Sequence, residues 1–341
     1  MDTRQATAYL INPVDTGTDP DQFLIPKKCG CTHPMQTVTI DSVELFLSHP
    51  VAMAVEWIGQ TEPMRQLCAC WLTVAPQDLP LTPRIIGHPG TGKTTLCMAA
   101  AHKRNLPVYI MQCTADTRPE DLLVSPVLAS SGKIAYHASP LLTAVITGGV
   151  AILDEGNRMA EKSWASLAGL FDNRRMVESI VAGVTVAAHE NFRAVVTMNE
   201  DSSTFEIPDY IMSRLQPGIE LGFPSREDEL RILTYNLPFA PEQVLEQCVL
   251  FLQRAHGYDL PYSVRDGINI VRYIVKQHAA DPLADTAELF NRSVAQILGT
   301  DALDLDALAN KRKMAGDHLP SMNLGDYFFD DDSELNPDRP R

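Results

Sequence analysis

An eight-residue stretch, Gly87 to Thr94, constrains this chain more than any other part of it. The stretch reads GHPGTGKT and has the spacing G-x-x-x-x-G-K-T. Ile85 and Ile86 lead into it as a short apolar strand, and the alanine-rich residues after Lys93 favour a helix. Glycines let the backbone curl so that consecutive N–H groups and a helix N-terminus face one anion. The stretch therefore predicts a loop that holds the phosphates of a nucleotide.

Two side chains of this loop have specific expected roles. Lys93 would reach the outer phosphates, and the hydroxyl of Thr94 would ligate Mg²⁺. The alternative is a glycine-rich turn that binds nothing, but four specified positions match by chance roughly once in a hundred chains of this length. The strand before the loop and the helix after it make a chance match rarer still. We expect nucleotide contacts from Gly87, His88, Pro89, Gly90, Thr91, Gly92, Lys93, Thr94 and Thr95.

Composition narrows the class of protein. A chain of 341 residues with 45% hydrophobic and 21% charged residues is ordinary for a globular protein, and its length suggests about two domains. The net charge of −15 and the pI near 5.0 disfavour non-specific nucleic-acid binding, which needs a basic surface. The first residues lack the pattern of a signal peptide, and the longest charge-free apolar run, 139–153, is too short to span a bilayer. We expect a cytoplasmic protein with no membrane insertion.

Seven cysteines, an odd number, do not indicate a disulfide framework. Cys68 and Cys70 lie in a predicted helix, where residues two apart face opposite sides and cannot share one metal ion. Cys29, Cys31 and His33 lie in a predicted loop and could bind a metal, but zinc sites have wider ligand spacings. Ordinary thiols are the favoured interpretation.

The order of expected elements predicts an α/β nucleotide-binding domain followed by a helical one. Apolar runs at 107–113, 149–155 and 192–199 read as strands separated by helices, which indicates a parallel sheet flanked by helices. An Asp-x-x-Glu match at Asp41 resembles a capping box and predicts helical segments that run to about Val74. We expect a partly disordered extension over 1–40, the α/β domain over 41–225, a small all-helical lid domain over 226–315, and a disordered acidic tail over 316–341 that could dock on a partner.

Two further strand ends carry polar residues that suit nucleotide chemistry. The run AILDE ends in Asp154 and Glu155, at the sheet edge where the phosphate loop also opens. Asp154 would hold Mg²⁺ through water, and Glu155 would orient and deprotonate an attacking water molecule. The run VVTMN ends in Asn199, whose amide can donate to a γ-phosphate and accept from that water. The alternatives are exposed acids at a strand end and an Asn that forms a turn.

The ordered set of motifs GHPGTGKT, LDE, TMN, IPDYIMSRL and SVR resembles the AAA+ ATPases, in particular the MoxR group of the helix-2-insert clade. The stretches Ile58-Gly59-Gln60, MQCTADTRPEDLL and ASPLLTAVITGGVAILDE are similar to further MoxR motifs, and the resemblance covers about residues 50–275. Gly156, Glu200 and Val264 depart from the group's usual residues.

This resemblance implies ATP hydrolysis with Mg²⁺ in a homo-oligomeric, hexameric ring. It implies an arginine finger at Arg214 that reaches a neighbouring subunit's site, a second sensor at Arg265 on the lid, and an adenine pocket lined by Ile58 and Gly59. Residues 122–138 would be the helix-2 insert and 175–192 a hairpin, both facing the pore of the ring. The resemblance further implies chaperone-like work on a protein client together with a von Willebrand factor A domain partner.

Two other functions are open to the sequence. A nucleic-acid-acting or defence-related AAA+ motor is the main alternative, although the acidic balance speaks against it and the stretch 175–192 has arginines only near its ends, Arg175 and Arg193. A non-enzymatic assembly switch is the other, and the set Glu155, Asn199 and Arg214 argues against it because a switch needs no hydrolytic residues.

Overall fold

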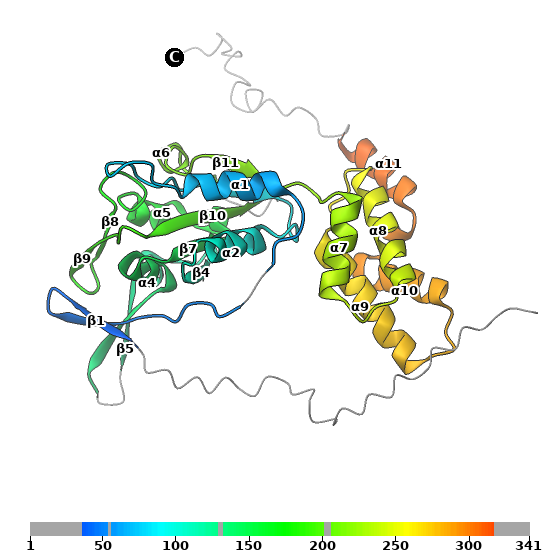
Figure 1. Ribbon diagram of the computed structural model, residues 1–341, viewed down its shortest axis with the longest axis horizontal. Coiled ribbons are helices and arrows are strands. Elements are labelled where there is room, and N and C mark those ends of the chain that lie inside the picture. The colour runs from blue at the N-terminus through cyan, green and yellow to red at the C-terminus, as the bar shows by residue number, and fades with distance from the viewer. Residues whose placement is uncertain (1–35, 54–55, 129–131, 201–205, 317–341) are drawn as a thin grey trace, which may run out of the picture. The chain divides into compact units, whose positions relative to one another are not determined.

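The computed structural model describes residues 36–53, 56–128, 132–200 and 206–316. Its central element is a five-stranded sheet in the order β11-β3-β10-β7-β4, with every neighbouring pair parallel (Figure 1). The fold-class prediction of a parallel sheet flanked by helices is confirmed. The strands are β3 (Arg84–Gly87), β4 (Val108–Gln112), β7 (Val150–Asp154), β10 (Arg193–Asn199) and β11 (Gly218–Glu220).

The inner strands β7 and β10 are almost entirely buried, because helices cover both faces of the sheet. Along β7 the side chains alternate between two cores: Ala151 and Leu153 belong to one, and Val150 and Ile152 to the other. Helices α1 and α2 pack on the second core, and α3, α4, α5 and α6 on the first. Their bounds are α1 (Thr61–Cys70), α2 (Lys93–Lys103), α3 (Pro119–Leu122), α4 (Pro140–Thr147), α5 (Glu161–Leu167) and α6 (Asp209–Met212), with the short 3₁₀ turn η2 (Gly156–Arg158) after β7.

The prediction of a helix beginning at Asp41 is wrong, because this part of the chain forms a β-hairpin. Strands β1 (Thr37–Ile40) and β2 (Val43–Phe46) pair antiparallel, and Asp41 and Ser42 between them have positive φ values of 47° and 68°. A tight hairpin turn needs left-handed residues, and Asp tolerates that conformation. The match at Asp41 therefore marks a turn, and the first described helix of this region is α1.

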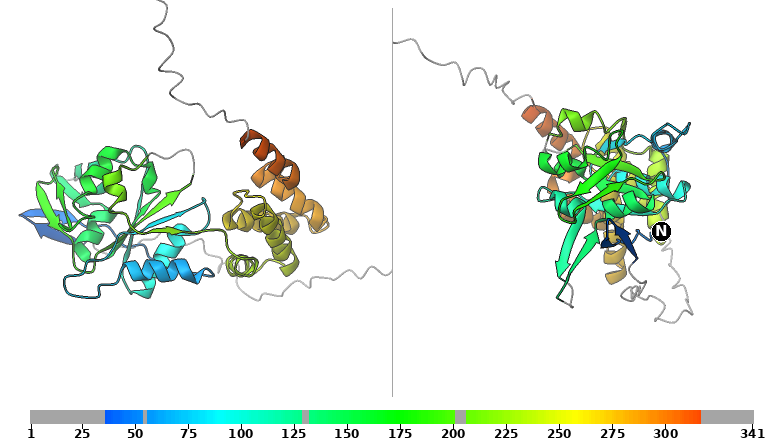
Figure 2. Two further views of the ribbon diagram at one scale, coloured as in Figure 1. Left: turned by 90° about the horizontal axis from the view of Figure 1, so that it is seen from above. Right: turned by 90° about the vertical axis from the view of Figure 1, so that its left-hand side faces the viewer.

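The β1–β2 hairpin belongs to a second, four-stranded sheet in the order β1-β2-β6-β5. Strand β2 pairs parallel with β6 (Ile134–Ala138), which pairs antiparallel with β5 (Val124–Leu128). The two hairpins project away from the central sheet (Figure 2). Strands β5 and β6 lie in the stretch 122–138 that the sequence predicts as an insert. The predicted hairpin within 175–192 is also present, as β8 (Met176–Ser179) paired with β9 (Val184–Ala187).

After residue 225 the described chain is helical and has its own core. Ser225 caps the first of these helices by accepting a hydrogen bond from the backbone N–H of Asp228 at 3.2 Å. Buried Leu233, Cys248, Ile270 and other apolar residues of these helices pack together. The helices are α7 (Arg226–Asn236), α8 (Glu242–His256), α9 (Val264–Ala280), α10 (Thr286–Leu298), the 3₁₀ turn η3 (Thr300–Leu303) and α11 (Leu305–Gly316).

Some sequence predictions fall beyond these ranges. Most of the 1–40 extension, the Cys29, Cys31 and His33 group, and the acidic tail after residue 316 lie outside the described residues. Within the described ranges, no helix has the length and apolar content needed to cross a membrane. Cys68, Cys70, Cys97, Cys113 and Cys248 are free thiols.

Candidate nucleotide-binding site

The predicted phosphate loop connects β3 to α2 and curls around the side chain of its lysine. Gly90 and Gly92 have φ values of +83° and +96°, in the left-handed region that favours glycine. A Cβ atom on Gly90 would lie 2.2 Å from the Ser263 hydroxyl, so this loop position has no room for a side chain. The Lys93 ammonium donates to the carbonyl oxygens of Gly87 and His88, both at 2.8 Å.

Lys93 is a buried cation, with 7% of its surface exposed. Burial lowers the pKa of Lys93, and the nearby charges of Asp154 and Glu155 oppose that shift. Both acceptors of the Lys93 ammonium are neutral carbonyl oxygens, so they leave the charge of this buried group unbalanced. An anionic ligand would balance it.

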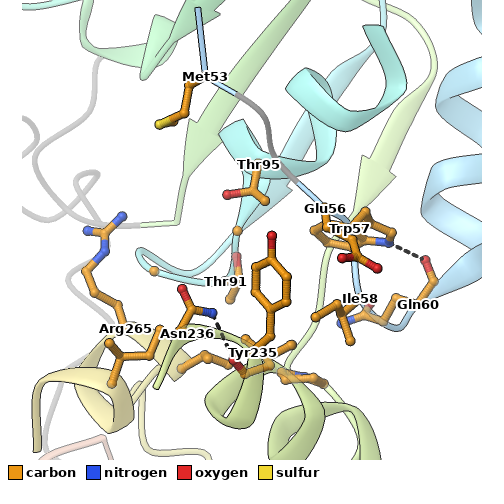
Figure 3. Close-up of a pocket in the computed structure, with 16 residues that line it drawn as sticks. Met53, Glu56, Trp57, Ile58, Gln60, Thr91, Thr95, Tyr235, Asn236 and Arg265 are labelled. Carbon is orange, nitrogen blue, oxygen red and sulfur yellow. Dashed lines mark hydrogen bonds between the residues drawn. The ribbon is translucent and has the colours of Figure 1, made fainter. Parts of the chain in front are cut away.

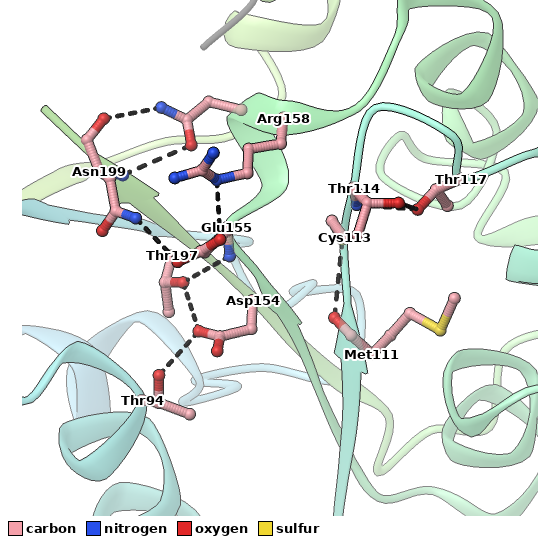
Figure 4. Close-up of polar contacts among 11 residues, drawn as sticks. Thr94, Met111, Cys113, Thr114, Thr117, Asp154, Glu155, Arg158, Thr197 and Asn199 are labelled. Carbon is pink, nitrogen blue, oxygen red and sulfur yellow. Dashed lines mark hydrogen bonds and ion pairs between the residues drawn. The ribbon is translucent and has the colours of Figure 1, made fainter. Parts of the chain in front are cut away.

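The ends of β7 and β10 bring Asp154 beside the loop (Figure 4). The Oδ1 atom of Asp154 accepts hydrogen bonds from the hydroxyls of Thr94 at 2.7 Å and Thr197 at 2.6 Å. The Thr197 hydroxyl, fully buried, also accepts from the backbone N–H of Glu155 at 2.9 Å. Thr197 thus fixes the position of both acids at the end of β7.

Glu155 contacts two side chains through its carboxylate. Its Oε1 atom accepts from the Asn199 amide at 2.9 Å, and its Oε2 atom lies 2.7 Å from the Arg158 guanidinium (Figure 4). Asn157 holds the end of β10, because its amide donates to the carbonyl of Asn199 at 2.8 Å and its Oδ1 accepts from the Asn199 N–H at 3.4 Å. Glu155 and Asn199, predicted from separate motifs, are therefore in direct contact.

A cavity of about 100 Å³ unites most of the predicted site. It is lined by loop residues, by the ends of β7 and β10 and by Arg265 near the start of α9. The phosphate-loop motif does not predict that Arg265 lies here. That prediction came from the SVR motif and the resemblance to AAA+ ATPases. The lining comprises Pro89, Gly90, Gly92, Lys93, Thr94, Thr95, Asp154, Glu155, Thr197, Asn199 and Arg265.

A larger pocket of about 390 Å³ adjoins the same loop (Figure 3). Trp57, Ile58 and Thr91 line it from the α/β part, and Tyr235 and Arg265 from α7 and α9. Its mixture of aromatic and aliphatic walls with a few polar groups is typical of sites for small molecules and cofactors.

Gly59 has a different place from the one predicted. It is not among the residues that line the larger pocket, although its neighbours Ile58 and Gln60 are. Its φ is +85°, and a Cβ atom there would lie 2.6 Å from the carboxyl carbon of Asp228. Gly59 therefore allows the chain to pass close to α7.

Arg214 lies apart from both pockets, just after α6. Its guanidinium donates to the carbonyl oxygen of Tyr210 and lies 3.7 Å from the carboxylate of Asp172. Hydrogen bonds from Arg174 lower the pKa of Asp172 to about 2, and the charge of Arg214 acts in the same direction. Within one chain, the structure does not bring Arg214 to Lys93 or Glu155.

The donor set fits Mg²⁺ as it stands. The hydroxyl of Thr94 and the carboxylate of Asp154 are hard oxygen ligands in contact beside the phosphate cavity, and Mg²⁺ commonly takes one or two protein ligands together with phosphate oxygens and water. Among the described residues, no group of three or more His, Cys, Asp and Glu side chains is arranged to hold a metal ion. The site would therefore depend on phosphate oxygens to complete the shell of ligands.

Sequence reasoning missed three residues of the site: Thr197, Asn157 and Arg158. Thr197 stands two positions before Asn199 in the quoted TMN motif, and Asn157 and Arg158 stand two and three positions after Glu155. Thr197 could have been noticed because it is a polar residue inside the mostly apolar strand β10. Nothing in the local pattern distinguishes Arg158 from an exposed arginine.

Comparison with known proteins agrees with this geometry. Residues 84–215 match the AAA domain model of the dynein-related subfamily. The chain is 26% identical over 212 residues to von Willebrand factor A domain-containing protein 8 of Mus musculus, which covers 56% of this chain and 11% of that protein. It is also 26% identical over 244 residues to Protein NorQ of Paracoccus denitrificans, covering 65% of this chain and 86% of NorQ.

Among solved structures, NtrX from Brucella abortus in complex with ADP aligns with a TM-score of 0.50 and 18% identity, over 70% of this chain and 55% of NtrX. At this identity the likeness concerns the fold alone. The sheet, the phosphate loop and the acids at its edge define a P-loop protein of the AAA+ class. Within that class the similarity to NorQ agrees with the resemblance to the MoxR-type AAA+ ATPases that the motifs predict.

Proposed function

We propose that this protein hydrolyses ATP to ADP and phosphate and uses the reaction to remodel or activate a partner protein complex. The observation that carries the proposal is the gathering of Lys93, Thr94, Asp154, Glu155 and Asn199 around one small cavity. These residues come from three separate strand ends and are the set that phosphoryl transfer to water requires.

Each residue has a chemical task in this proposal. The phosphate-loop amides and Lys93 bind the phosphates, and Lys93 balances their charge inside a buried site. Glu155 takes a proton from the attacking water as that oxygen bonds to the γ-phosphorus and the bond to the β-phosphate oxygen breaks. Asn199 donates its amide to the γ-phosphate or the water. Thr94 and Asp154 would hold Mg²⁺, which supplies positive charge to the phosphate oxygens.

The larger pocket would receive the nucleoside. Trp57 and Ile58 offer apolar surface for the base, and Arg265 lines both cavities and so suits a sensor between base and phosphates. Gly59 acts here through the backbone alone, by allowing the approach of α7.

The active assembly would be a homo-oligomeric ring, most simply a hexamer, in which Arg214 reaches the neighbouring site. Support comes from its position outside both pockets and near the exposed surface, where its side chain is 29% accessible. An added guanidinium beside the γ-phosphate stabilises the charge of the transition state. The name of the mouse relative favours a von Willebrand factor A domain as the partner of this chain.

A nucleic-acid motor is the second candidate, and the net charge of −15 weighs against it. ATP turnover measured with and without DNA separates the two: we expect no stimulation by DNA. Stimulation by DNA that disappears at high salt would favour the motor.

The test of hydrolysis compares the wild-type chain with Lys93→Ala and Glu155→Gln. Lys93→Ala should lose ATP binding in calorimetry, because it removes the buried cation of the loop. Glu155→Gln should keep binding and lose on the order of 10²–10⁴ in rate, because an amide cannot take the proton. Wild-type turnover by Glu155→Gln would show that the base lies elsewhere, and tight ATP binding by Lys93→Ala would contradict the phosphate-loop assignment.

A further inference from the structure

A cluster of positive charge lies at the edge of the central sheet opposite the phosphate loop. Arg193 begins β10 and Arg104 follows the end of α2, so both lie where the parallel strands start. Burial lowers the pKa of Arg193, and the nearby charges of Arg104 and Arg175 act in the same direction. Lys103 precedes Arg104 in the chain and is exposed. We call Lys103, Arg104, Arg175 and Arg193 the basic cluster.

Within the described ranges, no carboxylate forms a salt bridge with the basic cluster. Arg193 is 4% exposed, and its side chain donates at 2.8–2.9 Å to the backbone carbonyl oxygens of Trp71, Glu190 and Phe192. The Nε atom of Arg104 is buried and has no hydrogen-bond partner among the described residues. Carbonyl oxygens hold Arg193 in place without neutralising its charge, so the basic cluster suits an anionic group.

An exposed apolar loop, residues 72–81, adjoins the basic cluster. It begins after Trp71, whose carbonyl oxygen accepts from Arg193. Backbone hydrogen bonds fix the loop, because the N–H of Leu81 donates to the carbonyl of Cys70 at 2.8 Å. Its large aliphatic side chains are 41–84% exposed, namely Leu72, Val74, Leu79 and Leu81. Exposed apolar side chains gathered in this way, next to charged groups, are typical of an interaction surface.

The basic cluster and the apolar loop together suit a segment that combines acidic with aromatic residues. The chain carries such a segment, DYFFDDD at 326–332, which lies outside the described residues. Nine residues, 317–325, join α11 to it, and an extended stretch of that length spans up to about 30 Å. The net charge of the whole chain is −15, so an acidic segment is repelled by most of the protein and attracted to its cationic places.

We propose that residues 326–332 dock on this surface, with their aspartates at the basic cluster and their aromatic rings on the apolar loop. Docking of this kind neutralises the basic cluster and covers the exposed aliphatic side chains. Salt weakens the charged part of the contact and leaves the apolar part in place. The proposal does not rest on ATP hydrolysis, because neither part of the surface lines the phosphate cavity.

The test is photo-crosslinking in the full-length chain. A benzophenone-bearing phenylalanine analogue replaces Phe328, and mass spectrometry identifies the peptides that it joins on irradiation. We expect crosslinks to residues 72–81. Raising the salt concentration should lower their yield.

Charge reversal tests the basic cluster. The double variant Lys103→Glu with Arg104→Glu should lower the yield by about fivefold at low salt, because exposed charge pairs are of modest strength. Arg193 stays unchanged because its buried guanidinium supports the local backbone. Lys162→Glu is the matched control, since Lys162 is an exposed lysine on α5, outside the basic cluster, and should leave the yield unchanged.

A polar substitution tests the apolar loop. Val74→Ser removes the side chain that is 84% exposed and should lower the crosslink yield without changing thermal unfolding. Leu283→Ser is the matched control, because Leu283 is 96% exposed in the helical region and should have no effect on the yield.

Crosslinks from position 328 that avoid residues 72–81 in the folded chain would overturn the docking. An unchanged yield in folded Lys103→Glu with Arg104→Glu would overturn it too, because the aspartates would then have no partner in the basic cluster. If Val74→Ser lowered the oligomer mass and left the crosslinks as they were, the apolar loop would be a contact between copies of the chain, and the proposal would be wrong.

Discussion

Gly156, at the residue scale, explains one departure of this chain from the usual MoxR pattern. A Cβ atom on Gly156 would lie 2.4 Å from Cγ1 of Val196 and 3.2 Å from the ring of Trp164. Trp164 is fully buried, so its ring cannot move aside. The large side chain on α5 thus takes the space that an apolar residue after the two acids would otherwise fill.

We therefore expect Gly156→Ala to destabilise the chain by about 1–3 kcal/mol, as overpacking does in a dense core. Thermal unfolding measures this cost, and Gly222→Ala is the matched control because nothing lies within 4 Å of its Cβ position. In a Val196→Ala background, which lacks the clashing Cγ1, the cost of Gly156→Ala should be smaller than in the wild-type chain. If Gly156→Ala were as stable as Gly222→Ala, the packing account of this position would be wrong.

Much of the candidate site could be predicted from single residues in short motifs. The roles of Lys93 and Thr94 follow from the spacing of the phosphate-loop motif. The role of Asp154 follows from the rule that parallel strands end at one edge of a sheet. Thr197 and Asn157 could not be assigned, because their roles depend on hydrogen bonds between β7 and β10 that no short stretch encodes. The placement of Gly59 depends on α7, more than 160 residues away in the chain.

At the scale of elements, secondary structure was predicted correctly for the long apolar or amphipathic stretches and wrongly for the short β1–β2 hairpin. The apolar runs of β7 and β10 and the amphipathic helices α8 and α9 were recognisable, since burial on one or both faces dictates their residues. The β1–β2 hairpin has strands of four residues, and its partner β6 is nearly 90 residues further along. Strands that pair at such a distance in the chain leave no pattern in the local sequence that predicts the pairing.

Helices α7 and α8 share a buried acid that makes stability depend on pH. Glu229 is fully buried, and its Oε2 accepts from the Gln253 amide at 2.9 Å. Burial raises the pKa of Glu229 to about 7, and the hydrogen bond from Gln253 opposes the shift only in part. The folded chain therefore holds this proton more tightly than the unfolded chain, and stability from Glu229 is lost as pH rises from about 4.5 through 7.

We expect Glu229→Gln to stabilise the chain at pH 8 by up to about 3 kcal/mol and to have little effect near pH 4.5, since the amide keeps an acceptor for Gln253 without a charge to bury. Denaturant unfolding at several pH values measures the difference. Exposed Glu227 on the same helix provides the control Glu227→Gln, which should show no such pH dependence. A Glu229→Gln effect equal at both pH values would contradict a buried, titrating Glu229.

On the scale of the whole molecule, Arg214 does not reach the cavity of its own chain. Lys93, Glu155 and Asn199 surround one cavity, whereas Arg214 contacts Tyr210 and Asp172 instead. Composition and hydrophobic pattern predicted the parallel sheet and the run of helices after it, because both follow from which residues must be buried. Assembly does not follow from burial within one chain, so the ring stays a prediction.

The central claim is that this protein hydrolyses ATP at sites completed by Arg214 of a neighbouring subunit. Its most direct test mixes two inactive variants, Arg214→Ala and Glu155→Gln, and measures ATP turnover. Mixed rings contain interfaces that pair an intact Glu155 with an intact Arg214, so part of the activity should return and dilution below the assembly concentration should remove it. Mixing Lys93→Ala with Glu155→Gln is the control and should restore nothing, because both residues act in the same chain's site. No recovery in rings shown to contain both Arg214→Ala and Glu155→Gln subunits would contradict the claim.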